Sequence, residues 1–249
     1  MRILLAGESW TTHMIHVKGF DTFTTSEYVE GAGELIDGLR AAGHELDYLP
    51  GQDVSSRFPT GAEELRAYDV VIVSDVGANS FLIGRETFNH SRPQPNRLAA
   101  LAEYVEGGGG LLMIGGYLSF SGIDGKARYG RSPLARVLPV GVLDRDDRVE
   151  VPEGIAPTVL RGDHPALAEV PAGDWPSLLG YNQVEPLAAS DLLVGVGEDP
   201  LLAVATVGSG RTAAFTSDLA PHWAPPEFMA WDGYMPLWLG LLAWLSGER

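Results

Sequence analysis

The segment Asp69–Asp75, with the sequence DVVIVSD, is the feature that most restricts the possible folds of this chain. Four β-branched residues follow one another without the alternation of polar and apolar side chains that a half-exposed strand shows. Such a run is typical of a strand buried on both faces. The runs Ile3–Ala6 and Leu111–Ile114 have the same character. The sequence therefore predicts a parallel sheet with helices on both faces.

Strand-like and helix-like segments alternate along the first half of the chain. Residues 8–21 are expected to form a polar loop, and an amphipathic helix is expected from Ser26 to Gly43. A strand at His44–Leu49, a short helix at Ala62–Tyr68 and a helix capped by Asn96 follow. This order indicates right-handed βαβ units. We therefore predict a three-layer α/β/α fold of the flavodoxin-like type with a mostly parallel sheet.

The pattern changes in the second half. Residues 117–165 are rich in glycine, proline and charge, which predicts an irregular insertion or side sheet within a single domain covering residues 1–249. Asp191–Gly197 and Leu201–Val207 are expected to pair as a hairpin. A buried strand at Thr212–Thr216 and an apolar terminal helix at Met235–Leu245 then complete the fold.

The charge and the missing cysteine exclude several classes of function. The chain has 17 basic and 33 acidic residues and a net charge of −16, which opposes binding to nucleic acid or to anionic membranes. With no cysteine, it has no disulfide, thiolate metal site or thiol nucleophile. The stretch Met235–Leu245 is shorter than the ~20 residues of a membrane span, and Ile3–Ala6 is too short for a signal peptide. We expect a cytoplasmic protein.

Four polar clusters follow predicted strands, and a parallel sheet would bring all four to its carboxyl edge, where ligands bind. We therefore predict a pocket for a small polar molecule at this edge. The clusters are Glu8–His13 with His16 and Lys18; Asp75 with Asn79 and Ser80; Gly115–Ser119; and Ser217-Asp218 with His222 and Glu227.

The candidate catalytic residues are His222 as a general base, Asp218 as the carboxylate that orients it, and Ser119 as a nucleophile in a strand–turn–helix elbow. Ser119 in a purely structural turn is the alternative, since Gly-x-Ser-x-Gly is absent. The other candidates bind the ligand: Ser9, Trp10, His13, His16, Asp75, Tyr117 and Ser217.

His13 and His16 allow two interpretations. On one face of a helix they could bind a metal together with Asp75 or Asp218, but no tight metal-binding motif accompanies them. Alternatively, they donate hydrogen bonds that order a long loop. We predict no metal and no cofactor. Trp10, Trp223 and Trp231 flank the polar clusters, either as walls of a pocket or as part of the core.

Three segments carry a resemblance to a known family: GESWTTHMIHVKGFDTF at residues 7–23, IGGYLSF at 114–120 and AFTSDLAPHW at 214–223. Together they resemble bacterial glutamine amidotransferase-like proteins of the class I glutamine amidotransferase superfamily, near the trehalose-utilisation proteins. The segment GEDPLLAVATVGSGRTAAFTSD at residues 197–218 resembles the late hairpin and strand of the same proteins. The resemblance covers most of the chain and implies the flavodoxin-like fold predicted above.

The chain departs from the working glutaminases of that superfamily at both catalytic motifs. Those enzymes carry a cysteine in a G-x-C-x-G elbow and a His-x-Glu pair after a late strand; here the elbow is IGGYLSF, and the first acid after His222 is Glu227. We therefore expect no glutamine hydrolysis. The resemblance implies a sugar-related ligand. Two alternatives remain: a hydrolase or isomerase-like enzyme using His222, and a non-catalytic assembly module, as the same fold is in some β-galactosidases.

The segment Met235–Leu245 also bears on assembly. Its apolar residues lie on nearly every side of a helix, whereas packing against one face of a sheet needs only one apolar stripe. We expect another subunit to cover the surplus, most simply in a twofold dimer. The alternative is a helix enclosed entirely by its own chain.

Overall fold

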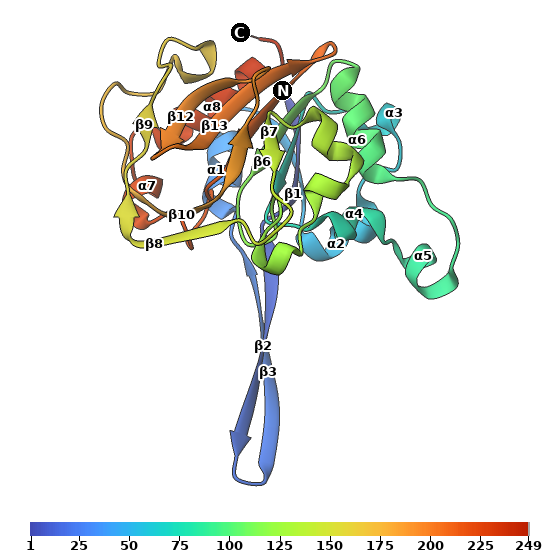
Figure 1. The fold of residues 1–249 in the computed structure, drawn as a ribbon. Helices are drawn as coiled ribbons and strands as arrows, with labels where there is room; N and C mark the ends of the chain where they lie inside the picture. Colours follow the sequence, from blue (N-terminus) through green and yellow to red (C-terminus); the bar gives the residue numbers. More distant parts are fainter. Residues whose placement is uncertain (249) are drawn as a thin grey trace.

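An eight-stranded sheet forms the centre of the computed structural model, which describes residues 1–248 (Figure 1). Its strand order is β4-β1-β5-β6-β14-β13-β12-β9. The first five strands pair in parallel, and the last three continue the sheet as antiparallel neighbours, which confirms the predicted α/β architecture. The strands are β1 (Arg2–Gly7), β4 (Glu45–Leu49), β5 (Val70–Ser74), β6 (Gly110–Ile114), β9 (Thr158–Val159), β12 (Asp191–Val196), β13 (Asp199–Val207) and β14 (Gly210–Phe215).

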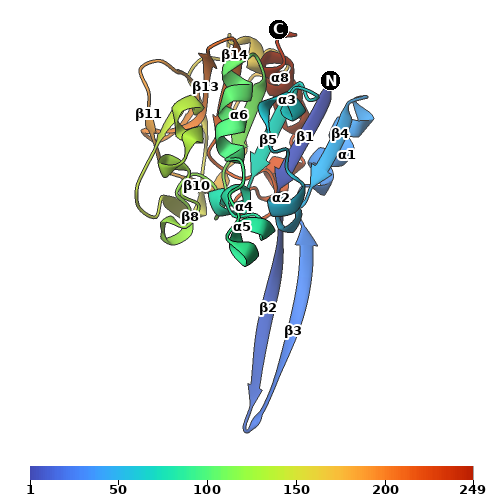
Figure 2. The same ribbon diagram turned by 90° about the vertical axis from the view of Figure 1, so that its right-hand side faces the viewer.

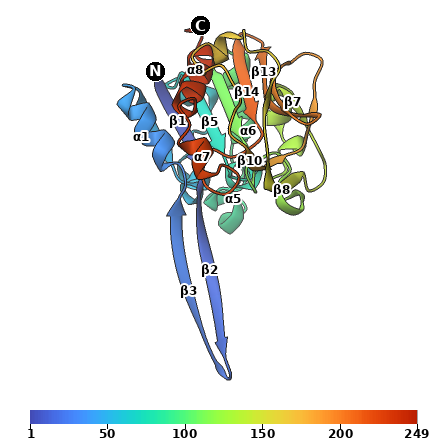
Figure 3. The ribbon, with the colours of Figure 1, turned by 90° about the vertical axis from the view of Figure 1, so that its left-hand side faces the viewer.

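Helices cover both faces of this sheet and create two separate cores. Successive side chains of a strand point to opposite faces, so Ile3 and Leu5 of β1 join one core while Leu4 and Ala6 join the other. Helices α1 and α8 lie on the first face, and α6 lies on the second with α2, α3 and α4 (Figures 2 and 3). The helices are α1 (Gly33–Ala41), α2 (Gly51–Arg57), α3 (Ala62–Leu65), α4 (Ala78–Leu82), α5 (Arg85–His90), α6 (Arg97–Glu106), α7 (Pro226–Met229) and α8 (Tyr234–Leu245).

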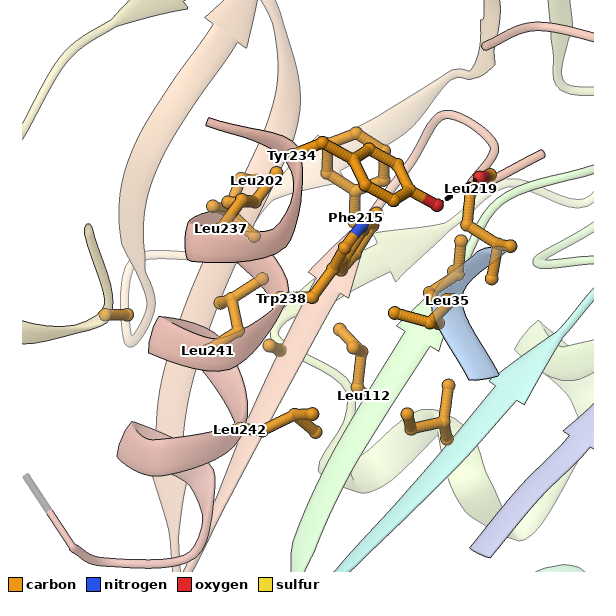
Figure 4. Packing of buried hydrophobic residues seen from close by; sticks show 14 of the residues in the cluster. Leu35, Leu112, Leu202, Phe215, Leu219, Tyr234, Leu237, Trp238, Leu241 and Leu242 are labelled. Atoms are coloured by element: carbon orange, nitrogen blue, oxygen red, sulfur yellow. Dashed lines mark hydrogen bonds between the residues drawn. The ribbon is translucent and has the colours of Figure 1, made fainter. Parts of the chain in front are cut away.

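Helix α8 is enclosed by its own chain. Leu237, Trp238 and Leu241 pack onto the sheet, where the Trp238 ring meets Phe215 edge-on at 5.2 Å (Figure 4). On the other side of the helix, Gly240 lies against the segment of the short 3₁₀ turn Pro165–Leu167, close enough that a Cβ would collide with a carbonyl. The expectation that another subunit must cover this helix is therefore wrong. No helix among residues 1–248 is long and apolar enough to cross a membrane.

The largest correction concerns residues 9–30. In place of a loop and a helix start, β2 (Ser9–Lys18) and β3 (Asp21–Glu30) form a long antiparallel hairpin, called the hairpin arm below. It projects from the carboxyl edge of the sheet, away from both chain ends (Figures 1–3). Its β-branched and aromatic residues favour strands, and Gly19, with φ of +64°, suits the two-residue turn. Helix α1 therefore begins only at Gly33.

Apart from β9 and the turn Pro165–Leu167, residues 117–186 form short 3₁₀ turns and two small antiparallel sheets beside the central one. β7 (Val140–Val142) pairs with β11 (Val184–Pro186), and β8 (Arg148–Ile155) pairs with β10 (Leu178–Asn182). The 3₁₀ turns in front of β7 span Ile123–Gly125, Tyr129–Arg131 and Pro133–Val137. The loop after β6 passes from the central sheet into this layer, which therefore borders the carboxyl edge.

Candidate functional site

A cavity of about 430 Å³ lies at the carboxyl edge of the parallel strands. Its walls come mainly from the segments that follow β1, β5, β6 and β14, which are neighbours in the sheet. The fold thus brings together members of all four polar clusters that follow the predicted strands. The cavity is lined by Glu8, Trp10, Asp75, Tyr117, Leu118, Ile123, Asp218, Pro221 and His222.

Glu8 is the most deeply buried acid of the cavity, with 1% of its surface exposed. It follows β1 directly and takes a left-handed backbone conformation, with φ of +49°. Its Oε2 accepts a hydrogen bond of 2.6 Å from the Ser74 hydroxyl. Burial raises the pKa of Glu8 well above its ordinary value, and the charges of Asp218 and Asp75 raise it further. Glu8 therefore favours the neutral, protonated form.

Asp75 occupies the equivalent place after β5 and has the same unusual backbone, with φ of +40°. Its Oδ1 accepts a hydrogen bond of 2.6 Å from the Leu118 amide. Burial raises its pKa to about 6; the charge of Asp218 contributes, while the Leu118 amide and His222 oppose the shift. Left-handed conformations at two non-glycine residues cost energy and cluster at functional sites. Of the six non-glycine residues with positive φ among residues 1–248, Glu8 and Asp75 hold carboxyl groups in the cavity.

Asp218 and His222 face each other across the cavity wall that follows β14. The distance from His222 Nδ1 to Asp218 Oδ2 is 3.6 Å, with the imidazole 36% exposed and the carboxylate nearly buried. The other oxygen, Oδ1, accepts hydrogen bonds from the amides of Leu219 and Ala220, at 2.7 and 3.2 Å. These bonds fix the carboxylate and leave Oδ2 directed at the ring. At 3.6 Å the two atoms are close enough for an ion pair but beyond hydrogen-bond distance, so a small movement of the ring would be needed for Asp218 to orient it.

An aromatic wall completes the cavity. The Tyr117 ring meets the His222 ring edge-on with centroids 4.3 Å apart, and His222 stacks on Trp223. One carboxylate, Glu150, accepts hydrogen bonds from the Tyr117 hydroxyl at 2.9 Å and from Trp223 Nε1 at 3.0 Å. Partial burial and Glu150 raise the pKa of Tyr117, so its hydroxyl stays protonated and its ring remains a neutral, fixed surface.

Two buried polar residues that the sequence did not indicate hold this wall in place. Asn182, at the end of β10, accepts a hydrogen bond from the Gly116 amide and donates one to the Gly116 carbonyl. Its amide group also donates to Asp147, which accepts further bonds from the amides of Ser121 and Gly122. Burial raises the pKa of Asp147, whereas these hydrogen bonds favour its charged form. The network ties the loop after β6 to the side sheets.

Five of the predicted site residues lie outside the cavity lining. Ser119 is fully buried: its hydroxyl donates to the Ile114 carbonyl and accepts from the Asp75 amide, so it holds the turn. Ser217 donates to the Gly180 carbonyl, and Ser9 accepts from the Gly51 amide. His13 and His16 lie out on the hairpin arm, where they contact Ser26 and Thr25.

His13 and His16 do not share one face of a helix, because both lie on strand β2. Side chains three residues apart on a strand point to opposite sides. Among residues 1–248, no three His, Cys, Asp or Glu side chains are placed so that they could hold one metal ion. By contrast, the predicted residues Trp10, Asp75, Tyr117, Asp218 and His222 do line one cavity.

A second cavity of about 620 Å³ adjoins the first, and Leu118 lines both. Its wall is polar and includes the exposed cations Arg128, Arg131 and Lys126, together with Asn79 and Ser80. Lys126 forms an ion pair with Asp124 at 2.7 Å. Asp124 and Asp144 also line this cavity, so a ligand that extends into it from the acidic first cavity would meet charges of both signs.

The fold and this cavity define a flavodoxin-like α/β protein of the glutamine amidotransferase-like class that has no cysteine nucleophile. A family model described as "Putative glutamine amidotransferase", GATase1_like, matches residues 2–247, and the chain belongs to this family. No functionally curated protein matches the chain.

The chain is also similar to proteins of known structure. The chain is similar to two proteins from Salmonella typhimurium, named cytoplasmic protein STM3548 and cytoplasmic protein STM1381. Each is 46% identical to it, with a TM-score of 0.94 over 98% of this chain and 99% of the other. A ThuA-like protein from Parabacteroides merdae shares the fold at 12% identity, with a TM-score of 0.60 over 100% of this chain and 90% of the other.

Proposed function

We propose that this protein binds a small polyhydroxylated molecule, of the sugar class, in the cavity at the carboxyl edge of the sheet. The observation that carries the proposal is the convergence of Glu8, Asp75, Asp218 and His222 on one cavity of about 430 Å³. These groups offer several hydrogen-bond acceptors and donors at close quarters, as a ligand with many hydroxyls requires. Trp10 and Tyr117 add the flat apolar surfaces against which a sugar ring can pack.

The sugar class rests on the chemistry of the cavity and on the resemblance to the trehalose-utilisation proteins, and the fold comparisons add only a shared architecture. The neighbours of similar fold include ThuA-like proteins and a β-galactosidase from Rahnella, of which the matched region is 26% of the chain. These similarities concern the fold, and the acidic, aromatic cavity supplies the chemistry. A cytoplasmic location is part of the proposal, because the two relatives at 46% identity carry that name.

The test is a thermal-unfolding screen of the purified protein with neutral sugars, sugar acids and polyols. A ligand present at 100 times its Kd stabilises the folded state by about 2.7 kcal/mol, which is readily seen as a rise in Tm. We expect Asp218→Asn to abolish the rise for the active compound, because it removes the charge of a carboxylate that lines the cavity. Glu227→Gln is the matched control, since Glu227 is an exposed acid outside the cavity. The proposal fails if no compound of these classes raises Tm, or if Asp218→Asn and Glu227→Gln respond alike.

A catalytic role for His222 is the second candidate. It is favoured by the 3.6 Å approach of His222 to Asp218 at an open cavity, together with the raised pKa of Asp75, about 6. A histidine beside a carboxylate, together with a second acid whose pKa is raised, is an arrangement that suits a hydrolase or an isomerase. NMR of each stabilising sugar during prolonged incubation would reveal turnover. We expect His222→Gln to stop it while leaving ligand-induced stabilisation measurable.

The assembly module is the remaining alternative for the cavity. It predicts that no small molecule stabilises the protein and that substitutions of His222 and Asp218 change only its stability.

A further inference from the structure

The hairpin arm, residues 9–30, exposes an unusual amount of apolar surface. Seven of the thirteen large apolar residues that are exposed among residues 1–248 lie on it. Ile15 and Val17 are 72% and 69% exposed, and Phe20 at the tip is fully exposed. Large apolar patches are uncommon on monomers, and a two-stranded ribbon with water on both faces is marginally stable on its own. The arm therefore has the character of a surface that a partner covers.

The arm is also present in relatives of known structure. It comprises 22 of the 249 residues, about a tenth of the chain, whereas each match to the two Salmonella proteins covers 98% of the chain. A superposition that failed over a tenth of the residues could not reach a TM-score of 0.94. Much of the arm therefore has a counterpart in the same position in both proteins. A ribbon that keeps its direction in proteins 46% identical behaves as a formed structural element.

The charges on the arm indicate what kind of partner it meets. Between Ser9 and Val17 on one strand, and between Thr22 and Ser26 on the other, there is no Asp, Glu, Lys or Arg. The chain as a whole carries a net charge of −16. Two copies would repel each other over most of their surfaces, but not along this uncharged stretch. Depletion of charge is also typical of the centre of a protein interface.

The edges of the arm point to the same partner. β2 and β3 pair only with each other, so the outer edge of each strand has free N–H and C=O groups. An edge strand can pair with its own copy in antiparallel fashion about a twofold axis, which requires no separately adapted partner. We infer that two copies of this protein form a dimer by pairing their hairpin arms about such an axis.

The length of the arm determines what each tip meets. Ten residues at about 3.3 Å each give a strand of roughly 33 Å. When two such arms overlap fully in antiparallel fashion, the tip of each reaches the base of the other. The base carries Trp10, which lines the ligand cavity. The partner's Phe20 therefore lies at the mouth of this cavity, and the dimer interface adjoins the site.

The area of contact sets a requirement on this arrangement. Pairing of two strand edges buries less than one face of the ribbon, and that face, roughly 33 Å by 10 Å, is itself well below the ~800 Å² per partner of a standard interface. The inferred dimer therefore requires additional contact between each tip and the partner's body.

The first experiment measures molar mass by light scattering and sedimentation at micromolar concentration. We expect twice the chain mass of 26.7 kDa for the wild type and 26.7 kDa for the double variant Ile15→Glu, Val17→Glu. The matched control is Phe88→Glu, because Phe88 is 79% exposed but lies on α5, outside the arm; it should remain dimeric. Circular dichroism establishes that each variant is folded. A monomeric wild type, or a dimer that the arm variant leaves intact, overturns the inference.

A second experiment tests the orientation of the arms. Because the chain has no cysteine, a single introduced thiol is unique in it. Phe20→Cys and Thr11→Cys are prepared separately, mixed, and treated with a short thiol-to-thiol cross-linker. The antiparallel arrangement predicts cross-links between the unlike subunits. Cross-linking of Phe20→Cys to itself, without cross-links to Thr11→Cys, would overturn it.

Discussion

Replacing Asp75 by Asn should make the protein more stable at neutral pH. The Asp75 carboxyl lies in the cavity with a pKa raised to about 6, chiefly by burial. Asn has nearly the same shape, can still accept the Leu118 amide through its Oδ1, and tolerates the left-handed φ of +40° at least as well. The substitution therefore removes the titration of the group while keeping its packing.

The magnitude follows from linkage between protonation and folding. Between the ordinary pKa of 3.8 and the folded value of about 6, the folded protein holds a proton that the unfolded chain releases. The free energy of unfolding therefore falls as pH rises through this window, by about 1.4 kcal/mol per pH unit and about 3 kcal/mol in all. The asparagine of the Asp75→Asn variant has no such proton to hold. The variant should match the wild type near pH 4 and exceed it by up to about 3 kcal/mol at pH 7.

Urea denaturation of both proteins at several pH values between 4 and 8 measures this difference. Glu227→Gln, which removes an exposed acid outside the cavity, should give a curve parallel to that of the wild type. Parallel curves for Asp75→Asn and the wild type would refute the reasoning, since they would mean that Asp75 titrates alike in the folded and unfolded states. A confirmed difference would show that this acid is retained at the expense of stability, as expected of a functional group.

Three further outcomes follow from the structure. Ser119→Ala should lower the free energy of unfolding by about 1–2 kcal/mol in a denaturant titration, because the Ile114 carbonyl and the Asp75 amide lose their hydrogen bonds. It should leave any ligand-induced rise in Tm unchanged, and loss of that rise would return Ser119 to the site. The purified protein should release no ammonia from glutamine in a coupled assay, since no thiol can form the thioester; release would contradict this. Gly31→Ala should lower the free energy of unfolding by about 1–3 kcal/mol, because its Cβ would lie 2.8 Å from Glu8 Oε1; an unchanged stability would show that Glu8 can move.

The parallel part of the fold could be predicted because its strands are continuous apolar runs. β5 and β6 are buried along their whole length, and a run of this kind has few other ways to be covered. The hairpin arm could not be predicted in the same way. Neither of its faces meets a core, so it lacks the alternation that normally reveals a strand, and its threonines and histidines resemble a polar loop.

The site was predictable only as far as the carboxyl edge of the sheet. Asp75, Tyr117 and Asp218 follow buried strands closely, so the topology alone brings them together. Asn182 and Asp147 lie 66 and 25 residues from the groups they brace, Gly116 and Gly122, and no local pattern connects them. The sequence predicts Ser119 and Ser217 as site residues, but both hydroxyls bond to the backbone instead. A hydroxyl at a strand end forms a hydrogen bond with a nearby backbone group as readily as it faces a ligand.

The two ends of the hairpin arm meet where it joins the body. The Gly31 amide donates a hydrogen bond of 2.9 Å to the Glu8 carbonyl, so the chain leaves the sheet and returns to it at one point. The geometry of the central sheet therefore does not depend on the length of the arm. Adding or removing pairs of residues between Glu8 and Gly31 would leave the other strands in register. This joint is accordingly a suitable place for grafting foreign hairpins. The base of the arm is constrained, because Glu8 and Trp10 both line the cavity and Ser9 accepts a hydrogen bond from the Gly51 amide.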